Sequence, residues 1–288
     1  MEIAGGIAVR LVLCLAALLM LLTHPQQCAY AAAGALRIWG MDVVPSLYPY
    51  MVLCRLSASL LLKTRLPPAV VVSALGLLGG SPSGAAALSV YDDADRIPSR
   101  LYRPLAVLCG GVSPMFLLQT VHCWGFDHSF CLRLLLVHAA GAFVTATLTL
   151  LHAPYSKQMG DQTHIRCVQQ DAVTQSIHGI LSIGACIMLF SVCAESVSII
   201  LPWMADGLRG GLLHAGLEMA GGIRKMAALM LPHSRAGVAI SFSAGFSGIS
   251  IIMQNYLLLD HRQTPLCWLI TFALLRALLC AFFACMVF

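Results

Sequence analysis

Apolar runs separated by short polar loops follow one another along the whole chain. Four of them are uninterrupted and close to the roughly 20 residues that a membrane-spanning helix needs. These four runs cover 46–62, 133–151, 179–201 and 266–288. Together with the interrupted runs described below, the pattern predicts an all-α polytopic membrane protein with roughly six to ten membrane segments.

The first apolar run, residues 7–23, is interrupted by Arg10. We interpret it as a retained helix whose arginine reaches the membrane interface. A cleaved signal peptide stays open as the alternative, because Ala-Tyr-Ala at 29–31 resembles a small-x-small cleavage site. The weakly amphipathic stretch 31–44 follows and carries Trp39, a residue type typical of the headgroup layer.

Four further apolar runs are broken near their centres by glycine, serine or proline. They cover 68–90, 104–121, 208–230 and 237–258. Proline lacks the backbone donor of a helix and clashes with the preceding turn, so a continuous helix through such a centre is unfavourable. The arms of 68–90 and 208–230 are too short to cross, and we expect re-entrant hairpins there. We expect discontinuous transmembrane helices at 104–121 and 237–258.

The two halves of the chain show these features in the same order: amphipathic lead-in, span, broken hairpin, broken span and clean span. If the hairpin does not cross, each half crosses the membrane an odd number of times, so the second half is inverted. Paired interrupted segments of this kind are typical of transporters built from inverted repeats. The predicted division is an N-terminal transmembrane helix or signal anchor (1–30), a first repeat (31–152), a polar linker (153–170) and a second repeat (171–288).

Composition agrees with this pattern and excludes several classes of protein. Of the 288 residues, 59% are hydrophobic and 10% are charged, against about 45–50% and about 25% in soluble domains. These fractions exclude a soluble enzyme, a disordered chain and a nucleic-acid-binding protein, and they indicate a multi-pass protein of a cell membrane, surrounded by the lipid bilayer. The net charge of +5 is modest, and the basic loops favour a cytoplasmic N-terminus.

The twelve cysteines lie mostly inside apolar runs and form no Cys-x-x-Cys pair, which indicates small hydrophobic side chains. Cys123 and Cys131 are the exception, because they lie near His122 and His128, a combination that can bind a metal. A flexible loop carries these residues and offers no fixed ligand geometry, so a metal site is not favoured there. The chain also lacks a Ser-His-Asp order, a phosphate loop and a His-Glu-x-x-His helix. We therefore expect no metal, no cofactor and no enzymatic activity.

The breaks at 79–84 and 110–114 are candidates for ligand binding. Half-helix N-termini inside a membrane have unpaired backbone N–H groups and partial positive charge, which suit a carboxylate. The alternative is that these small residues only allow close helix packing. Their recurrence in both halves favours a binding site near the middle of the membrane.

Three charged residues in apolar surroundings add candidate chemistry. Glu218 is costly at membrane depth, and we expect it to bind a coupling proton or cation, or to pair with Arg224 or Lys225. Arg224 suits bidentate contacts to a carboxylate, and an interfacial topology signal explains it equally well. Arg276, near the middle of the last span, is expected to face the protein interior and to contact an acid, a carbonyl or the substrate.

Polar side chains close to the breaks complete the predicted site. Hydroxyl and amide groups there can line a cavity, although serine in a membrane helix often bonds its own backbone. The predicted substrate-binding set consists of Gly80, Ser81, Pro82, Ser83, Gly84, Ser113, Pro114, Gln119, Glu218, Arg224, Ser247, Gln254 and Arg276.

Five motifs in order resemble one known family. They read GALRIWGMDVVPSLYPYMVL, GGSPSGAAA, SPMFLLQTV, GLEMAGGIRKM and SAGFSGISIIMQ, and the resemblance covers residues 30–288. This order is similar to that of the YlbJ-type sporulation integral membrane proteins, which belong to the nucleoside-recognition (Gate) group and whose fold resembles concentrative nucleoside transporters. The chain departs from the family at 79–82, where Gly-Gly-Ser-Pro replaces Ser-Gly-Tyr-Pro, and at Ser113, where the family usually has Asn.

The resemblance implies two Gate-like repeats and a transporter that moves dipicolinate, a small anion, into the forespore across the outer forespore membrane. Alternating access at a midplane site would be its mechanism. Coupling to a proton or sodium and a homo-oligomeric assembly are further expectations. Two alternatives stay open: a structural sporulation membrane protein that recruits partners without transport, and a transporter of nucleoside-type solutes.

Overall fold

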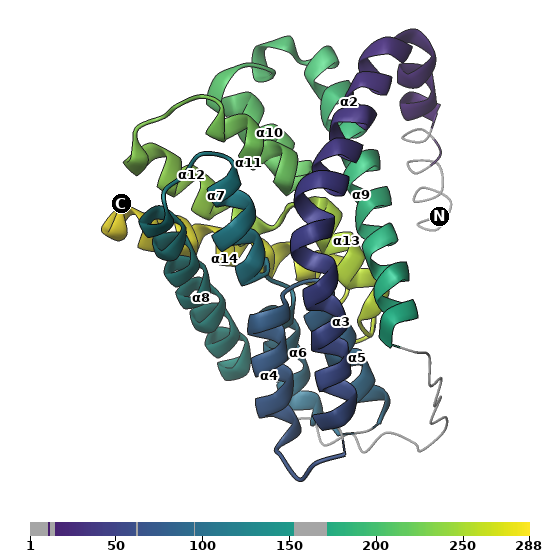
Figure 1. Ribbon diagram of the computed structural model, residues 1–288, viewed down its shortest axis with the longest axis vertical. Coiled ribbons are helices and arrows are strands. Elements are labelled where there is room, and N and C mark those ends of the chain that lie inside the picture. The colour runs from purple at the N-terminus through teal and green to yellow at the C-terminus, as the bar shows by residue number, and fades with distance from the viewer. Residues whose placement is uncertain (1–10, 12–14, 62, 95, 153–171) are drawn as a thin grey trace.

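The structure is a computed structural model that describes residue 11 and residues 15–61, 63–94, 96–152 and 172–288 (Figure 1). Within these ranges the regular secondary structure is entirely helical. The predicted linker 153–170 and the start of the first apolar run, including Arg10, lie outside the described residues.

The first half of the chain forms helices as far as residue 151. In order these are α2 (Pro25–Ile38), the π-helical η1 (Trp39–Val43), α3 (Val44–Leu61), α4 (Pro68–Gly79), α5 (Ser83–Asp93), α6 (Ser99–Cys109), the π-helical η2 (Phe116–Thr120), α7 (Val121–Cys123) and α8 (His128–Leu151). The second half consists of α9 (Ala172–Ile200), the short 3-10 helix η3 (Pro202–Met204), α10 (Gly207–Leu217), α11 (Met219–Ala227), α12 (His233–Phe246), α13 (Gly248–Leu258) and α14 (Leu266–Val287).

Four stretches among the described residues are helical, long and apolar enough to cross a membrane. They are α8, α9, α12 together with α13, and α14. The spans predicted at 133–151, 179–201 and 266–288 are confirmed as helices of this kind, and the chain is a multi-pass membrane protein. The span predicted at 46–62 forms as α3, an 18-residue helix that is not among the four.

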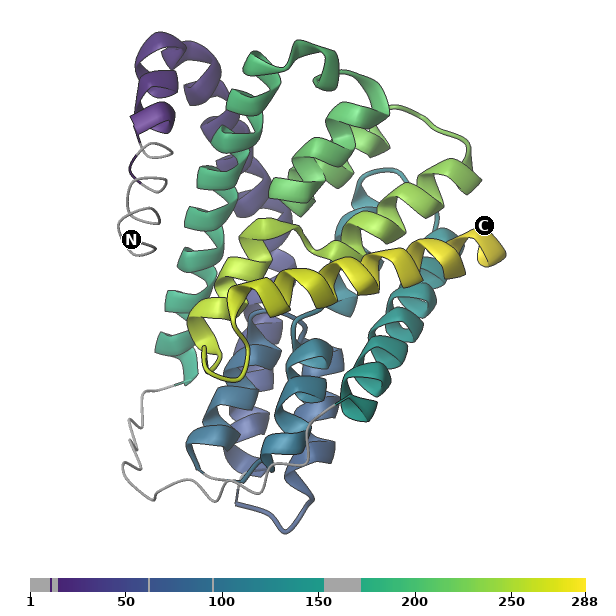
Figure 2. The same ribbon diagram turned by 180° about the vertical axis from the view of Figure 1, so that it is seen from behind.

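In each half the described part of the lead-in is continuous with the span that follows it. α2, η1 and α3 join into one continuous helix, and residues 172–178 continue directly into α9. The two long helices lie side by side along one edge of the molecule (Figures 1 and 2). Trp39 Nε1 donates a hydrogen bond to Ile180 O across them at 2.9 Å. The polar edge of this tryptophan is thus hydrogen-bonded within the helix pair.

All four predicted interruptions are breaks between helices. In the first half, residues 80–82 separate α4 from α5, and residues 110–113 follow the end of α6. In the second half, Glu218 separates α10 from α11, and Ser247 separates α12 from α13. The glycine- and proline-rich centres of the apolar runs therefore mark real changes in the course of the backbone.

The pairs α4/α5 and α10/α11 each pack through small residues. A Cβ placed on Gly84 would lie 2.9 Å from the Cα of Gly76, and one on Gly222 would overlap the backbone of Ala215. Larger side chains at these positions would push the paired helices apart. Close packing through small residues is the alternative explanation of the breaks. It does occur between the two helices of each pair.

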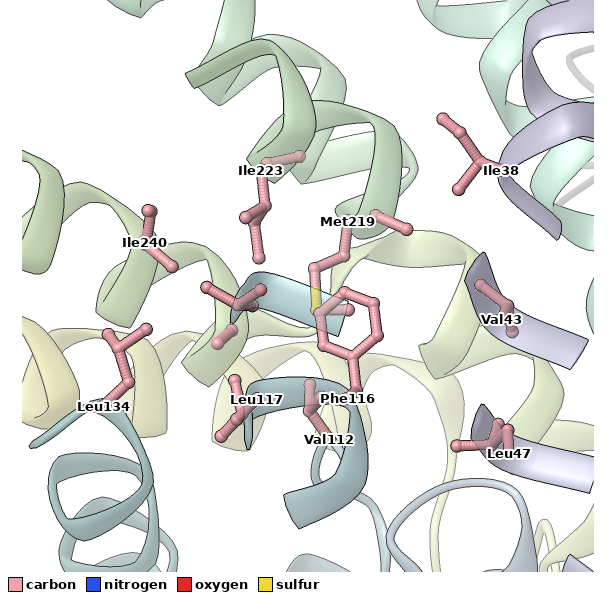
Figure 3. Close-up of a cluster of buried hydrophobic side chains, with 14 of the residues drawn as sticks. Ile38, Val43, Leu47, Val112, Phe116, Leu117, Leu134, Met219, Ile223 and Ile240 are labelled. Carbon is pink, nitrogen blue, oxygen red and sulfur yellow. The ribbon is translucent and has the colours of Figure 1, made fainter. Parts of the chain in front are cut away.

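Buried apolar side chains surround the region where the breaks come together. Phe116 of η2 lies beside Met219 of α11, and Ile223 continues the same cluster, with Val43 and Leu47 approaching from η1 and α3 (Figure 3). A second buried cluster joins α4, α5 and α6 to α13 and α14. The core therefore connects the two halves of the chain and fixes the breaks relative to one another.

Candidate functional site

The tip of the α4/α5 pair lies directly against the break that follows α6. The backbone N–H of Ser81 donates a hydrogen bond to Gly111 O at 2.6 Å. A Cβ on Gly80, whose φ is 57°, would lie 2.5 Å from the nitrogen of Ser113. The left-handed backbone and the close approach both require glycine at position 80.

The second half makes the same kind of contact with different residues. Gly248 has a φ of 74°, and a Cβ there would lie 3.0 Å from Ala215 O and 3.1 Å from Met219 N, beside the α10/α11 break. The preceding Ser247 also has a positive φ, 70°, which costs a residue other than glycine about 1–3 kcal/mol. Backbone strain of this size at a helix break is typical of functional positions.

Arg276 of α14 links the two broken helices. Its Nε donates to Gly245 O at 2.7 Å and its Nη1 to Val107 O at 3.2 Å. Its Nη2 donates to Gly110 O at 3.3 Å and to Ser247 Oγ at 2.9 Å. The side chain is only 4% exposed. Arg276 thus faces the protein interior and contacts carbonyls, one of the arrangements expected from its position in an apolar helix.

Asn255 of α13 makes a second link between the halves. Its Oδ1 accepts a hydrogen bond from Ser81 Oγ at 2.6 Å, and its Nδ2 donates to Gly110 O at 3.3 Å. The predicted set lacks this residue. The signal that points to it is an amide next to Gln254 in an otherwise apolar helix, where an unpaired polar side chain is costly.

A cavity of about 50 Å³ lies where the breaks meet. Its polar lining comes from both halves and consists of Ser81, Ser113, Glu218, Ser250 and Gln254. Apolar side chains of η1, α3, η2, α9 and α11 form the rest of the wall, several of which are visible in Figure 3. Because a water molecule occupies about 30 Å³ in the liquid, the cavity has room for about one or two waters.

Glu218 caps α11 with its own side chain. Its Oε1 accepts a hydrogen bond from Ala220 N at 2.8 Å, and its Oε2 accepts one from Gly221 N at 2.6 Å. The residue is 3% exposed and borders the cavity. The expected pairing with Arg224 or Lys225 is wrong, because a capping side chain turns back over the first N–H groups of its helix, whereas these cations lie further along it.

The two cations of α11 have other partners. Arg224 Nη1 lies 3.8 Å from Asp42 Oδ2, which also accepts a hydrogen bond from Trp124 Nε1 at 3.1 Å. Lys225 Nζ lies 2.7 Å from His214 Nε2. Both side chains therefore join α11 to neighbouring elements outside the cavity.

The structure divides the predicted set into residues that line the cavity and residues that do not. Those that line it are Ser81, Ser113, Glu218 and Gln254. Those that lie in the breaks, directly after them or across them, outside the lining, are Gly80, Pro82, Ser83, Gly84, Pro114, Ser247 and Arg276. Gln119 is exposed and Arg224 faces Asp42, so neither borders the cavity.

Side chains that commonly bind metals do not gather in the described part of the chain. No group of three or more His, Cys, Asp or Glu residues there could hold a metal ion. In the region singled out from its cysteines, His122 Nδ1 lies 2.7 Å from Phe126 O, and Cys131 is fully buried in the apolar core.

A distant relative aligns with most of the chain. Sporulation integral membrane protein YlbJ of Bacillus subtilis (strain 168) is 23% identical over 290 residues, which cover 81% of this chain and 71% of the relative. No family model matches the chain. No solved structure matches it either. The similarity extends the motif resemblance along most of the sequence, and the relative is an integral membrane protein by its name.

Proposed function

We propose that the chain is a sporulation membrane transporter that moves a small anionic metabolite, with dipicolinate as the first candidate, into the forespore. The observation behind this proposal is that three helix breaks, together with the start of α13 just after the fourth, surround one cavity lined from both halves. Irregular backbone at membrane depth is tolerated where it is buried in protein or lines a cavity, and transporters bind substrates at such breaks. The name of the B. subtilis relative supplies the sporulation context.

Matching positions in the two halves support an inverted repeat with re-entrant hairpins. The same spacing along the chain separates Ser81 from Glu218 and Ser113 from Ser250, and all four residues line the same cavity. In each half, the tip of a short helix pair lies against the break of the next helix through a glycine of positive φ. We interpret α4/α5 and α10/α11 as the hairpins of a Gate-like fold.

The cavity residues suit an anionic ligand that moves together with a cation. The hydroxyls of Ser113 and Ser250 and the Gln254 amide can donate hydrogen bonds to a carboxylate, whereas the Ser81 hydroxyl already donates to Asn255. An ionised Glu218 would repel the same ligand, and a proton or sodium ion bound beside it removes that repulsion. Coupling to one of these ions is therefore part of the proposal.

The small size of the central cavity supports alternating access as the mechanism of transport. Its volume of about 50 Å³ is well below the roughly 300 Å³ at which small-molecule sites begin. Movement of one group of helices past the other would enlarge the cavity and open it to one side at a time. In this interpretation the described conformation is a closed state of the transport cycle.

Uptake of dipicolinate into proteoliposomes, followed by terbium luminescence, tests the proposal. We expect uptake by the wild type and a loss of about tenfold or more in Glu218→Gln, equivalent to about 1.4 kcal/mol. Pro114→Ala should lose uptake as well, because alanine favours a helix through the break. Asp206→Asn, which removes an exposed carboxylate beside α10, is the matched control and should transport normally.

Two results would contradict different parts of the proposal. Wild-type vesicles that accumulate no dipicolinate under a proton or sodium gradient would exclude transport of this solute. Normal uptake in both Glu218→Gln and Pro114→Ala would exclude the site while leaving transport intact. Uridine in the same vesicles tests the alternative of a nucleoside-type cargo.

A structural role without transport is the second candidate, and the internal bonding of the breaks favours it. Glu218, Asn255 and Arg276 all bond within the protein, and the hairpin arms are closely packed. On this alternative, sporulation would depend on the chain and on its partners but would tolerate Glu218→Gln. Complementation of a deletion strain with this variant separates the two candidates.

The proposed location is the outer forespore membrane, with the lipid bilayer as the immediate surroundings. The proposal includes no catalytic step, metal or cofactor, and it includes a homo-oligomer as the assembly. A fluorescent fusion imaged during sporulation tests the location. Cross-linking of the detergent-solubilised chain tests the assembly. Recovery of the monomer alone would contradict the homo-oligomer.

A further inference from the structure

A second pocket, called the chamber below, lies between α3, α9 and α13, is open to the surface beside the exposed His178 and Ser182, and is larger than the central cavity. Its volume is about 270 Å³, close to the roughly 300 Å³ at which small-molecule sites begin. Its polar lining consists of Arg55, Gln175, His178, Ser182 and Gln254, and its described lining residues include no acidic side chain. The chamber is therefore a space of ligand size with one permanent positive charge.

Arg55 is incompletely bonded within the protein. Its Nη1 donates to Gln175 Oε1 at 2.8 Å, while its Nε is buried and has no hydrogen-bond partner. No ion pair between Arg55 and an acidic side chain occurs in the described part of the chain. An arginine in an apolar helix is expensive unless its charge is compensated. The charge of Arg55 is therefore left without a counter-charge beside a space of ligand size.

The chamber lies near one end of the long helices. Arg55 is within two turns of the end of α3 at Leu61, and Gln175 is in the first turn of α9. The loop after α3 carries Lys63 and Arg65, and basic loops of this kind prefer the cytoplasmic side. A solute from that side would therefore meet the chamber before it met the central cavity.

Gln254 separates the chamber from the central cavity and borders both. Pro82, another chamber residue, directly follows Ser81, which lines the central cavity. The Nε2 of Gln254 has no hydrogen-bond partner, and the residue is only 4% exposed. An amide side chain thus lies between the two spaces, and a carboxylate passing from one to the other would need a donor of this kind once the partition moves.

We propose that the chamber around Arg55 is a capture site for a carboxylate, occupied before the substrate passes Gln254 into the central cavity. Arginine can bind a carboxylate through two parallel N–H groups, and Nη2 of Arg55 makes no hydrogen bond within the described protein. This inference rests on the proposed function and deepens it, because it assigns the first contact of an anionic substrate to a residue far from the breaks.

Titration of dipicolinate into the purified full-length protein in detergent tests the capture site. We expect Arg55→Gln to weaken binding about tenfold or more, the loss of one charge-assisted interaction. Arg55→Lys keeps the charge but loses the paired contact, and should weaken binding about threefold to fivefold. Arg103→Gln is the matched control, because Arg103 donates to Gln263 O at 2.8 Å and borders neither space.

Vesicle transport gives a second readout, the KM for dipicolinate separately from the maximal rate. Loss of an arginine with a purely structural role would not change the KM alone. We expect Arg55→Gln to raise the KM for dipicolinate about tenfold with the maximal rate kept within about twofold. Glu218→Gln should show the opposite pattern, with binding in detergent kept and the transport rate lost. Thermal unfolding of each variant identifies any that fails to fold, and Arg55→Lys then carries the test.

The outcomes separate this inference from the function on which it rests. Wild-type protein that binds no dipicolinate contradicts both the capture site and the choice of cargo. Wild-type binding that is unchanged in Arg55→Gln and in Arg55→Lys overturns the capture site alone and leaves transport standing. A fall in the maximal rate with an unchanged KM also overturns it, because Arg55 would then act after binding.

Discussion

The tips of α4/α5 and α10/α11 occupy matching places in the two halves, yet they are stabilised in different ways. At the first tip, Ser81 gives its backbone N–H to Gly111 and its hydroxyl to Asn255, and both partners lie on other elements. At the second tip, Glu218 accepts two N–H groups from the helix that it begins. The first tip depends on the rest of the protein, whereas the second is capped locally.

This difference indicates how the two tips respond to movement. A tip capped by its own carboxylate keeps its hydrogen bonds when its surroundings shift. A tip held by residues on other helices loses them, and each buried polar group left unpaired costs about 1–3 kcal/mol. In the proposed cycle, α10/α11 is therefore the hairpin that can move as a unit, and α4/α5 is the one that stays with its neighbours.

Removal of Arg276 should have the largest effect, because this residue joins the break of each half. We expect Arg276→Leu to lower the free energy of unfolding by about 3 kcal/mol or more, since four acceptors lose the guanidinium donor and Gly110 O alone keeps the Asn255 amide. Unfolding by SDS in mixed micelles, followed by tryptophan fluorescence, measures it. Arg103→Gln is the control, and a loss below about 1 kcal/mol in Arg276→Leu would contradict the assigned role.

Alanine at two glycines of positive φ compares how closely the two tips are packed, because Gly80 lies in the first tip and Gly248, at the start of α13, faces the second. Gly80→Ala should cost about 2 kcal/mol or more, because its Cβ would lie 2.5 Å from backbone nitrogen. Gly248→Ala should cost only about 1–2 kcal/mol, because its nearest contact is 3.0 Å. The same unfolding assay gives both values. An equal or reversed order would mean that the first tip is not the more tightly held.

Two double-mutant cycles test whether the α4/α5 tip depends on α13 while the α10/α11 tip does not. Ser81→Ala and Asn255→Ala should be coupled by about 0.5–1.5 kcal/mol, because the two side chains share a hydrogen bond. Glu218→Gln and Asn255→Ala should add within about 0.5 kcal/mol. Strong coupling in the second cycle would show that the α10/α11 tip is not independent.

The smallest effect is expected at Gln119, which lies just beyond the first-half break. Gln119→Leu should change unfolding by about 0.5 kcal/mol or less, because the side chain is exposed and outside the cavity. It should also leave dipicolinate uptake unchanged, whereas Gln254→Leu should reduce it. Similar uptake losses in the two leucine variants would place Gln119 in the site after all.

The positions of the breaks could be predicted from the sequence because their causes are local. Pro82 and Pro114 lack a backbone donor, and Gly80 and Gly248 accept a positive φ, so the signals stand at the breaks themselves. The helix cap of Glu218 was harder to see, because the run around it reads as one glycine-rich segment until the start of α11 is known.

The contacts of the breaks could not be predicted, because they depend on residues distant in sequence. Asn255 meets Ser81 only after α13 has packed beside the first tip. In the sequence, Arg55 is one polar residue inside the apolar run 46–62. Its chamber exists only because α9 lies alongside α3. Periodicity and composition describe each helix alone, whereas a site of this kind is formed by several.

The π-helical segments η1 and η2 have a consequence for how the central cavity could grow. Each contributes to its wall, through Val43 and Phe116. A π turn holds about one residue more than an α turn, so rewinding it to α geometry rotates the helix beyond it by about 100°. Such rewinding would move Val43 or Phe116 away from the cavity without breaking the helix that contains it. The two π-helical turns thus hold extra residues at the wall of the cavity, and their rewinding would widen it where a ligand needs room.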